Sequence, residues 1–419
     1  MIELTPVEEK SIIFTLGFSK ADGLTYTSNF DYINLFFLIK SYGCDKKLEL
    51  LADLKEQILK FGPNATYLTS LSPLNEQLLE SRGHLELSQD ELDLMKVIFC
   101  EMHFLTIHLK KIDWINENAR NINLSENGLY VRYGVVELRV IENFFRIRDK
   151  CVDSVSNVIG RLDDESFIFK SMNQGQCKWI SADDYEFNLK ALMTNAGFYF
   201  SKNLEQAKND LSYWAHKYLE GLKLGQLFLC PPGYPFFWNV WNILEKDYKG
   251  HVEYVNFPDP ERFFGMLKGK KVLIVTPFKE LCERMVSEKR LQNLYKNFTV
   301  DTEFIFIKSP MSIYPSRPSE SWSSSFNELV NITAESFVNN KADIFMGSCG
   351  CYGIPLATEM YKKFNCPSVY YGNFLHTLLG IRQGCSKDFG DGFINEELRL
   401  DSDLSKYQNL SLIDGGRYV

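Results

Sequence analysis

The chain lacks the apolar segments that secretion or a membrane span would need. Its N-terminus, MIELTPVEEKSIIF, has no basic region followed by a long apolar stretch. Nowhere do as many as about 18 uncharged apolar residues, the length that a transmembrane helix requires, follow one another. We therefore expect no secretion by this route, no transmembrane segment and a cytoplasmic location.

The chain also lacks an excess of positive charge. Its 46 basic residues face 54 acidic ones, which gives a formal net charge of −8 at pH 7. A protein that binds duplex DNA by neutralising phosphates needs the opposite balance, so we expect no nucleic acid partner. This balance does not exclude a local site for one phosphorylated small molecule. Acyl hydrolysis has no support either, because the sequence contains no G-x-S-x-G nucleophile elbow.

The cysteines lack the clustering that would indicate a disulfide framework. All ten are scattered, and several lie in apolar runs such as LGQLFLC, which ends at Cys230. This distribution indicates buried free thiols in a reducing compartment. Cys349 and Cys351 form a C-x-C pair, but no second pair or histidine lies at ligand spacing, so zinc is weakly supported. Small residues in a close-packed turn explain the pair more simply, and we predict no metal ligand.

A chain of 419 residues is long enough for two or three domains, each with its own core. Residues 1–125 place apolar residues at helical spacing, and Ser88 and Glu91 have the spacing of a capping box. We interpret 1–125 as a mainly helical domain or cap. From Leu129 on, short β-branched and aromatic runs alternate with amphipathic helices, which is typical of a parallel sheet with crossovers. We predict an α/β fold for 126–419: a Rossmann-like, mostly parallel sheet with flanking helices.

Individual elements of this α/β region can be placed on the sequence. Runs such as KVLIVT lack alternation of polar and apolar residues, which favours strands that are buried on both faces. The expected strands are 129–134, 226–230, 252–257, 271–278, 303–308, 342–347 and 367–372. The clearest expected helices are 204–222, 278–296, 323–340 and 355–364. A long Pro/Ser-rich loop at 307–325 is of a kind that often has a function.

The strongest local signal is the segment ADIFMGSCGCYGIPLATEMYKKF at 342–364. A buried strand is expected to end at Gly347, a loop with Gly350 and Gly353 follows, and a helix begins near Ile354. Such a loop lets the backbone approach a ligand closely, and the N-terminus of the helix favours an anion. The spacing is not G-x-G-x-x-G and no P-loop lysine follows, which disfavours dinucleotide oxidoreductases and P-loop NTPases. An ordinary tight strand-to-helix turn would give the same pattern.

A second candidate is LYVRYGVVELRVIENFF at 129–145. Arg132 emerges from the expected strand, and Glu137 lies at the start of the helix that follows. An arginine can bind a phosphate or carboxylate through two hydrogen bonds, and a nearby glutamate can hold a divalent ion or accept a proton. A glutamate in the first turn is also an ordinary favourable charge in the field of the helix.

Two further loops could contribute ligand contacts. The segment around Asn195 and Gly197 forms a predicted turn, and PPGYPFFW at 231–238 follows an expected strand. Either could be structural punctuation instead. His376 is the histidine nearest in sequence to the glycine-rich segment, but it stands among apolar neighbours, where a hydrogen-bonded core histidine is the more common case.

Several segments together have a familiar order. They are RYGVVEL, TNAGFYF, KVLIVTPFKELCERM, FIKSPMSIY, the stretch from ADIFMG to LLGIR at 342–382, and the ending IDGGRYV. Over roughly 126–419 the chain resembles a family of bacterial proteins from polysaccharide (capsule and O-antigen) biosynthesis loci that is related to GT-D type glycosyltransferases. In that domain an early strand ends in an Arg-aromatic-Gly-Asp-Gly-Glu motif, which Arg132 and Glu137 match. The resemblance implies a Rossmann-like transferase that uses a nucleotide-activated sugar.

The chain departs from that family at two places. Val135 and Val136 stand where the motif has Asp-Gly, so one acidic group that could help to hold Mn²⁺ or Mg²⁺ is missing. Arg382 stands where relatives have a Lys-Gly-Lys-Arg-Trp-like run, so a basic grip on a diphosphate would rest on Arg382 there. With Glu137 as the catalytic residue, the substrate-binding residues that we predict are Arg132, Asn195, Gly197, Gly347, Ser348, Gly350, Tyr352, Gly353, His376 and Arg382.

Three functions are compatible with these patterns. The first is a glycosyltransferase that moves a sugar from a nucleotide-sugar to a glycan or lipid-linked acceptor, with peripheral association at the membrane through that acceptor. The second is a non-catalytic nucleotide-sugar-binding module or scaffold of a polysaccharide assembly complex, which the missing acidic group would suit. The third is another group transferase that acts on phosphorylated sugars. Oligomeric state is not predicted.

Overall fold

The computed structural model describes residues 18–19, 25–26, 120–146, 148–169, 185–228, 254–256, 259–382 and 394–401. The chain divides into two compact units, and the second comprises 119–230 with 239–419. Of the first unit, only β1 (Phe18–Ser19) and β2 (Thr25–Tyr26) are described, and they pair antiparallel. The mainly helical region predicted for 1–125 therefore lies almost wholly outside the described residues, as does the predicted loop 231–238.

Within the described ranges of the second unit, eight strands form one sheet in the order β3-β6-β5-β4-β10-β9-β7-β8. Every neighbouring pair in this sheet is parallel, so the predicted parallel α/β fold is confirmed for this region. The strands are β3 (Arg120–Asn121), β4 (Leu129–Arg132), β5 (Gln226–Phe228), β6 (Tyr254–Asn256), β7 (Lys271–Thr276), β8 (Glu303–Lys308), β9 (Ile344–Gly347) and β10 (Ser368–Tyr370).

All seven expected strands are present, and the sheet contains in addition β3, which was not predicted. The small parallel pair of β11 (Ile381–Arg382) and β12 (Leu400–Asp401) was not predicted either. Both additions are two residues long in each strand, so they offer no apolar run that the sequence could reveal. The helices of the second unit that lie in described residues are α6 (Val135–Arg146), α7 (Arg148–Gly160), α8 (Glu165–Phe169), α9 (Tyr185–Asn195), α10 (Leu204–Leu224), α12 (Pro260–Leu267), α13 (Lys279–Ser287), α14 (Trp322–Asn339), α15 (Gly353–Phe364) and α16 (Phe374–Leu378).

The helix predicted for 278–296 is wrong in its second half. α13 ends at Ser287, Lys289 takes a left-handed backbone conformation, and a 3₁₀ turn follows at Leu291–Asn293. Leu294 and Tyr295 are nevertheless buried, because the irregular chain turns them into the core. Apolar residues in this loop therefore reproduce the spacing of a helix without forming one.

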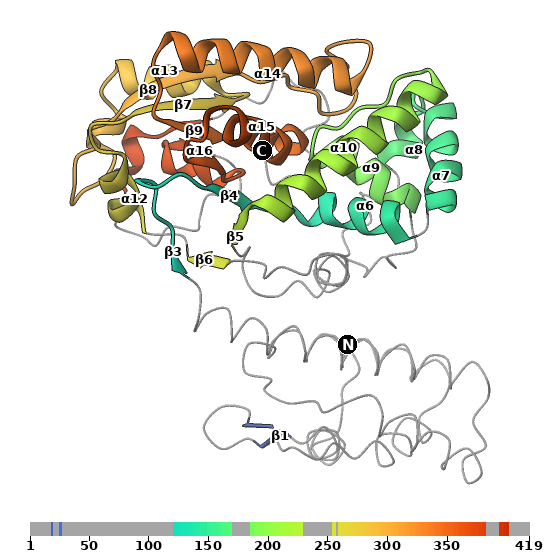
Figure 1. Ribbon diagram of the computed structural model, residues 1–419, viewed down its shortest axis with the longest axis horizontal. Coiled ribbons are helices and arrows are strands. Elements are labelled where there is room, and N and C mark those ends of the chain that lie inside the picture. Colours follow the sequence, from blue (N-terminus) through green and yellow to red (C-terminus); the bar gives the residue numbers. More distant parts are fainter. Residues whose placement is uncertain are drawn as a thin grey trace. The chain divides into compact units, whose positions relative to one another are not determined.

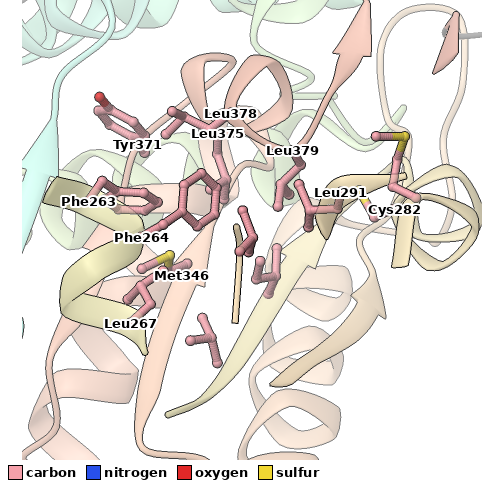
Figure 2. Close-up of a cluster of buried hydrophobic side chains, with 14 of the residues drawn as sticks. Phe263, Phe264, Leu267, Cys282, Leu291, Met346, Tyr371, Leu375, Leu378 and Leu379 are labelled. Atoms are coloured by element: carbon pink, nitrogen blue, oxygen red, sulfur yellow. The ribbon is translucent and has the colours of Figure 1, made fainter. Parts of the chain in front are cut away.

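One face of the sheet is covered by α12, α13 and α16. Their apolar side chains pack on alternate residues of the strands, such as Ile274 of β7 and Met346 of β9. Figure 2 shows this core, with Phe263 and Phe264 of α12 beside Leu375, Leu378 and Leu379, which lie in or just after α16.

The opposite face of the sheet is covered by α10, α14 and α15, which pack against one another (Figure 1). α15 lies on β9, β10 and β4. Asp210 of α10 accepts hydrogen bonds from the backbone of Trp322 and from the hydroxyl of Ser323 at the start of α14, at 3.1 and 2.6 Å. This buried carboxylate satisfies free donors at the end of a helix, and so it fixes α14 against α10.

Strands β4 and β10 are neighbours from which the chain leaves toward opposite faces. After β4 the chain runs through α6–α9 into α10, which packs with α15, whereas α16 follows β10 on the face of α12 and α13. Such a reversal is a topological switch point, and in open α/β sheets ligands bind outside the carboxyl ends of the strands at this place. The same reversal occurs between β10 and β9, which α15 follows on the face of α10, so the topology points to the loops after β4, β10 and β9. No helix among the described residues is long and apolar enough to cross a membrane.

Candidate site at the carboxyl edge of the sheet

The strand register brings the loops after β4, β10 and β9 to one edge of the sheet. Tyr370 at the end of β10 pairs with Val131 of β4 on one side and with Gly347 of β9 on the other. The residues that follow each strand therefore begin at the same level. Ser348 connects two of these loops, because its hydroxyl donates a hydrogen bond of 2.7 Å to the carbonyl oxygen of Gly372.

Arg132 is the last residue of β4, and its guanidinium reaches the loop after β10. Its Cζ atom lies 4.9 Å from the centroid of the Phe374 ring, at a distance typical of a cation–π contact. A Cβ atom on Gly372 would lie 2.6 Å from Nη1 of Arg132, and Gly372 has a φ of +59°. The absence of a side chain at Gly372 thus makes room for the guanidinium. Arg132 lies at the end of a strand, as predicted, and this strand is one of the pair at the switch point.

Glu137 lies in the first turn of α6 and is only 6 % exposed. Its carboxylate folds back over Gly134, since a Cβ atom there would lie 2.0 Å from Oε2. The carboxylate therefore packs against the backbone of Gly134. Because Glu137 is buried, a substrate must approach closely to use it as a base.

Two buried tyrosines lie beside this pair of charges. Burial raises the pKa of Tyr218 and of Tyr370 far above the usual range; the negative charge of Glu137 acts in the same direction, and that of Arg132 acts in the opposite direction. Both phenols therefore stay protonated at neutral pH. Tyr218 also accepts a hydrogen bond of 3.1 Å from the backbone N–H of Gly134. The Arg132–Glu137 segment is thus backed by neutral hydroxyl groups.

The glycine-rich loop has the predicted layout, with β9 ending at Gly347 and α15 beginning at Gly353. Its amide groups, however, largely bind the protein itself. The N–H groups of Ser348 and Cys351 donate to the carbonyl oxygens of Val275 and Ala196, at 2.9 and 2.8 Å. Those of Tyr352 and Gly353 donate to carbonyl oxygens of the same loop, Cys349 and Gly350. These four amides are not available to a phosphate.

The glycines of this loop allow close packing. Gly350 has a φ of +55°, and a Cβ atom there would lie 2.3 Å from the carbonyl oxygen of Ala196. At Gly353 a Cβ atom would lie 1.9 Å from the ring of Tyr370. The alternative of a tight strand-to-helix turn, which the sequence left open, accounts for both residues. The anion-binding site predicted at this loop stays a prediction, because these four amides already donate to carbonyl oxygens of the protein.

The predicted turn at 195–197 packs directly against the glycine-rich loop. Gly197 takes a φ of +75° just after the end of α9, and its carbonyl oxygen accepts a hydrogen bond of 2.5 Å from Ser312. The same hydroxyl donates to Tyr352 at 3.2 Å. Asn195 accepts a hydrogen bond of 3.0 Å from Thr194. The structure therefore brings two predicted loops together, through the Pro/Ser-rich segment that contains Ser312.

His376 and Arg382 have protein partners. His376 is buried in α16, and its Nε2 lies 2.8 Å from Oγ1 of Thr276. Burial lowers the pKa of His376 to about 3, so the ring is neutral at physiological pH. Arg382 lies in β11, where its Nη1 is 2.8 Å from a carboxylate oxygen of Asp401 and its Nη2 is 2.9 Å from the carbonyl oxygen of Glu396. A diphosphate would have to compete with a carboxylate for Arg382.

Among the described residues, acidic, histidine and cysteine side chains do not gather at this edge into a site for a divalent metal. No group of three or more histidine, cysteine, aspartate or glutamate side chains that could hold an ion occurs in the described part of the chain. Cys349 and Cys351 are buried free thiols, and burial raises the pKa of Cys349 to about 12. The Sγ atom of Cys351 accepts a hydrogen bond of 3.1 Å from the indole of Trp322. Both thiols are therefore packed, protonated groups, and they do not have the character of metal ligands.

Sequence reasoning missed Gly372, Phe374 and Tyr218, which surround Arg132 and Gly134. Gly372 ends the predicted strand 367–372 and Phe374 follows it, so the rule that ligands gather at strand ends could have found them. Tyr218 lies in a predicted helix, and nothing in the sequence near it shows which loop its hydroxyl reaches. No family model, curated protein or solved structure matches this chain.

Proposed function

We propose that this protein is a glycosyltransferase with a Rossmann-like catalytic domain that binds a nucleotide-sugar at the carboxyl edge of β4 and β10. The observation that carries the proposal is the position of Arg132, whose guanidinium reaches from the end of β4 to Gly372 and Phe374 in the loop after β10. A guanidinium at a topological switch point suits the diphosphate of a nucleotide donor. The resemblance to polysaccharide-locus proteins supports the same substrate class.

The chemical roles follow from charge. Sugar transfer releases a nucleotide diphosphate, and the positive charge of Arg132 stabilises the negative charge that develops on it. The oxygen of the acceptor hydroxyl attacks the anomeric carbon, and Glu137 takes up the proton of that hydroxyl. The proposed reaction uses no metal ion, because no group of described side chains at this edge suits one. We place the reaction in the cytoplasm, with a glycan or lipid-linked acceptor that can bring the protein to the membrane surface.

A non-catalytic nucleotide-sugar-binding module is the second candidate. It is favoured by the burial of Glu137, whose side chain is only 6 % exposed and so has little access to an acceptor. A panel of UDP-, GDP-, CMP- and dTDP-sugars, with and without Mn²⁺, separates the two candidates. A transferase should be stabilised against heat by one donor and should transfer its sugar or slowly hydrolyse it. A thermal shift without turnover favours the binding module, and stabilisation by none of the donors contradicts both.

A further inference from the structure

Helix α10 contacts both loops that meet at the carboxyl edge. Tyr218 accepts the N–H of Gly134 at 3.1 Å, and Trp214 donates its indole N–H to the carbonyl oxygen of Cys351 at 3.1 Å. The two side chains are four residues apart and therefore lie on the same face of the helix, one turn from each other. Both are completely buried. One helix thus holds the loop after β4 and the loop after β9.

α10 is itself fixed by close packing. At Gly221 a Cβ atom would lie 2.4 Å from a methyl carbon of Ile354 and 2.5 Å from the hydroxyl of Thr358, so this glycine lets α15 approach α10 closely. At the other end, the carboxylate of Asp210 binds the start of α14. A side chain on a helix that is held at both ends places its hydroxyl group more accurately than a side chain on a loop would.

We propose that Tyr218 is a positioning residue, which holds the Gly134 backbone and thereby sets where Arg132 and Glu137 lie at the ligand site. This inference rests on the proposed function for the identity of the ligand. Gly134 stands between the two charged residues in the chain, so a hydrogen bond to its amide restricts the position of both. Tyr218 does not need to touch the ligand, because it acts through Gly134.

The change Tyr218→Phe removes one oxygen atom and keeps the ring. The N–H of Gly134, which is partly shielded from water, then loses this acceptor, and shielded donors are costly to leave unpaired. The segment is expected to open locally more often than in the wild type, while the packing of α10 stays intact. The control is Tyr213→Phe on the same helix, which removes an exposed hydrogen bond of 3.3 Å that the Tyr213 hydroxyl donates to Asn327.

Two measurements test the proposal on the full-length chain. Amide hydrogen exchange read by NMR should show at least about tenfold faster exchange of the Gly134 amide in Tyr218→Phe, the effect of losing about one net hydrogen bond. The Cys351 amide, which donates to Ala196, should exchange as in the wild type. Calorimetric titration with the nucleotide-sugar that stabilises the wild type should show about tenfold weaker binding in Tyr218→Phe and no change in Tyr213→Phe.

The outcomes separate this inference from the proposed function. Unchanged exchange at Gly134 in Tyr218→Phe overturns the positioning role. So does a variant that has a lower melting temperature but binds the donor as tightly as the wild type, because a purely structural tyrosine would give that result. If the wild type binds no nucleotide-sugar, the proposed function fails, while the exchange measurement still decides whether Tyr218 fixes the Gly134 segment.

Discussion

Two glycine-containing regions meet at the same edge of the sheet and use their glycines differently. In the loop after β9, Gly350 and Gly353 let the backbone of Ala196 and the ring of Tyr370 approach. At the switch point, Gly134 and Gly372 instead make room for the charged groups of Glu137 and Arg132. A glycine indicates that something approaches closely, but the approaching group decides whether the position serves stability or ligand binding. Substitutions in the packed loop should therefore mainly lower stability, whereas substitutions at the switch point should mainly weaken ligand binding.

The largest effect is expected in the packed loop. Gly353→Ala places a methyl group into the ring of Tyr370, where neither the ring nor the start of α15 can move without disturbing the core. Overpacking of this kind costs roughly 3 kcal/mol of unfolding free energy. Urea denaturation followed by circular dichroism measures it.

A matched control lies in α12, where a Cβ atom on Gly265 would meet nothing within 4 Å. Gly265→Ala should therefore leave stability unchanged or raise it by about 0.5–1 kcal/mol, because alanine favours the helix. If Gly353→Ala were as stable as Gly265→Ala, the loop would not be closed by packing, and its amides could serve a ligand after all.

A second effect concerns the helix that follows the switch-point loop. The pKa of His376 is lowered from 6.5 to about 3 by burial, so the unfolded chain binds a proton between these values and the folded chain does not. Above pH 6.5 the histidine is neutral in both states and does not change the free energy of unfolding. As the pH falls below 6.5, protonation of the unfolded chain lowers the free energy of unfolding, by about 2 kcal/mol at pH 5.

The variant His376→Gln tests this point, because it removes the titrating group. Stability curves from pH 8 to pH 4.5 should converge as the pH falls, with the wild type losing more. His216→Gln, which removes an exposed histidine of α10, is the control for the loss of a histidine as such. Parallel curves for the wild type and His376→Gln would mean that α16 opens to water and does not hold a neutral histidine.

At the switch point a glycine substitution should affect binding more than folding. Gly372→Ala places its methyl group 2.6 Å from Nη1 of Arg132 and strains a backbone with φ +59°. The stability cost should be about 1 kcal/mol, from the left-handed conformation, because the long arginine side chain can move aside. Donor affinity, measured by calorimetry, should fall at least about tenfold as the guanidinium is displaced. Unchanged affinity would show that Arg132 does not need its present position.

The smallest effect on stability is expected for Glu137→Gln, since glutamine has nearly the size of glutamate and keeps one side-chain oxygen as an acceptor. Unfolding free energy should change by less than about 1 kcal/mol. The rate of sugar transfer should nevertheless fall at least about 100-fold, because an amide cannot take up the proton of the attacking hydroxyl. A radiolabelled-donor assay measures the rate. Full activity in this variant would remove Glu137 from the proposed chemistry.

Much of the second unit could be predicted from the sequence, because buried parallel strands such as KVLIVT carry continuous apolar runs. The layout of β9, its loop and α15 could also be predicted from local residues. The contacts of this loop could not be predicted, because Ala196 and Tyr370 lie in other segments. Only the folded chain brings them to Gly350 and Gly353. For the same reason, the sequence identified Arg132 and Glu137 but not Tyr218, which reaches Gly134 from a distant helix.

The proposed donor site depends on Arg132, and one titration tests this dependence most directly. The wild type and the variant Arg132→Met, which keeps an unbranched side chain and removes the guanidinium and its charge, are titrated with the same panel of nucleotide-sugars. We predict saturable binding of one donor by the wild type and at least about tenfold weaker binding by Arg132→Met, with both proteins folded by circular dichroism. Equal affinity in the two proteins would contradict a donor site at the edge of β4 and β10.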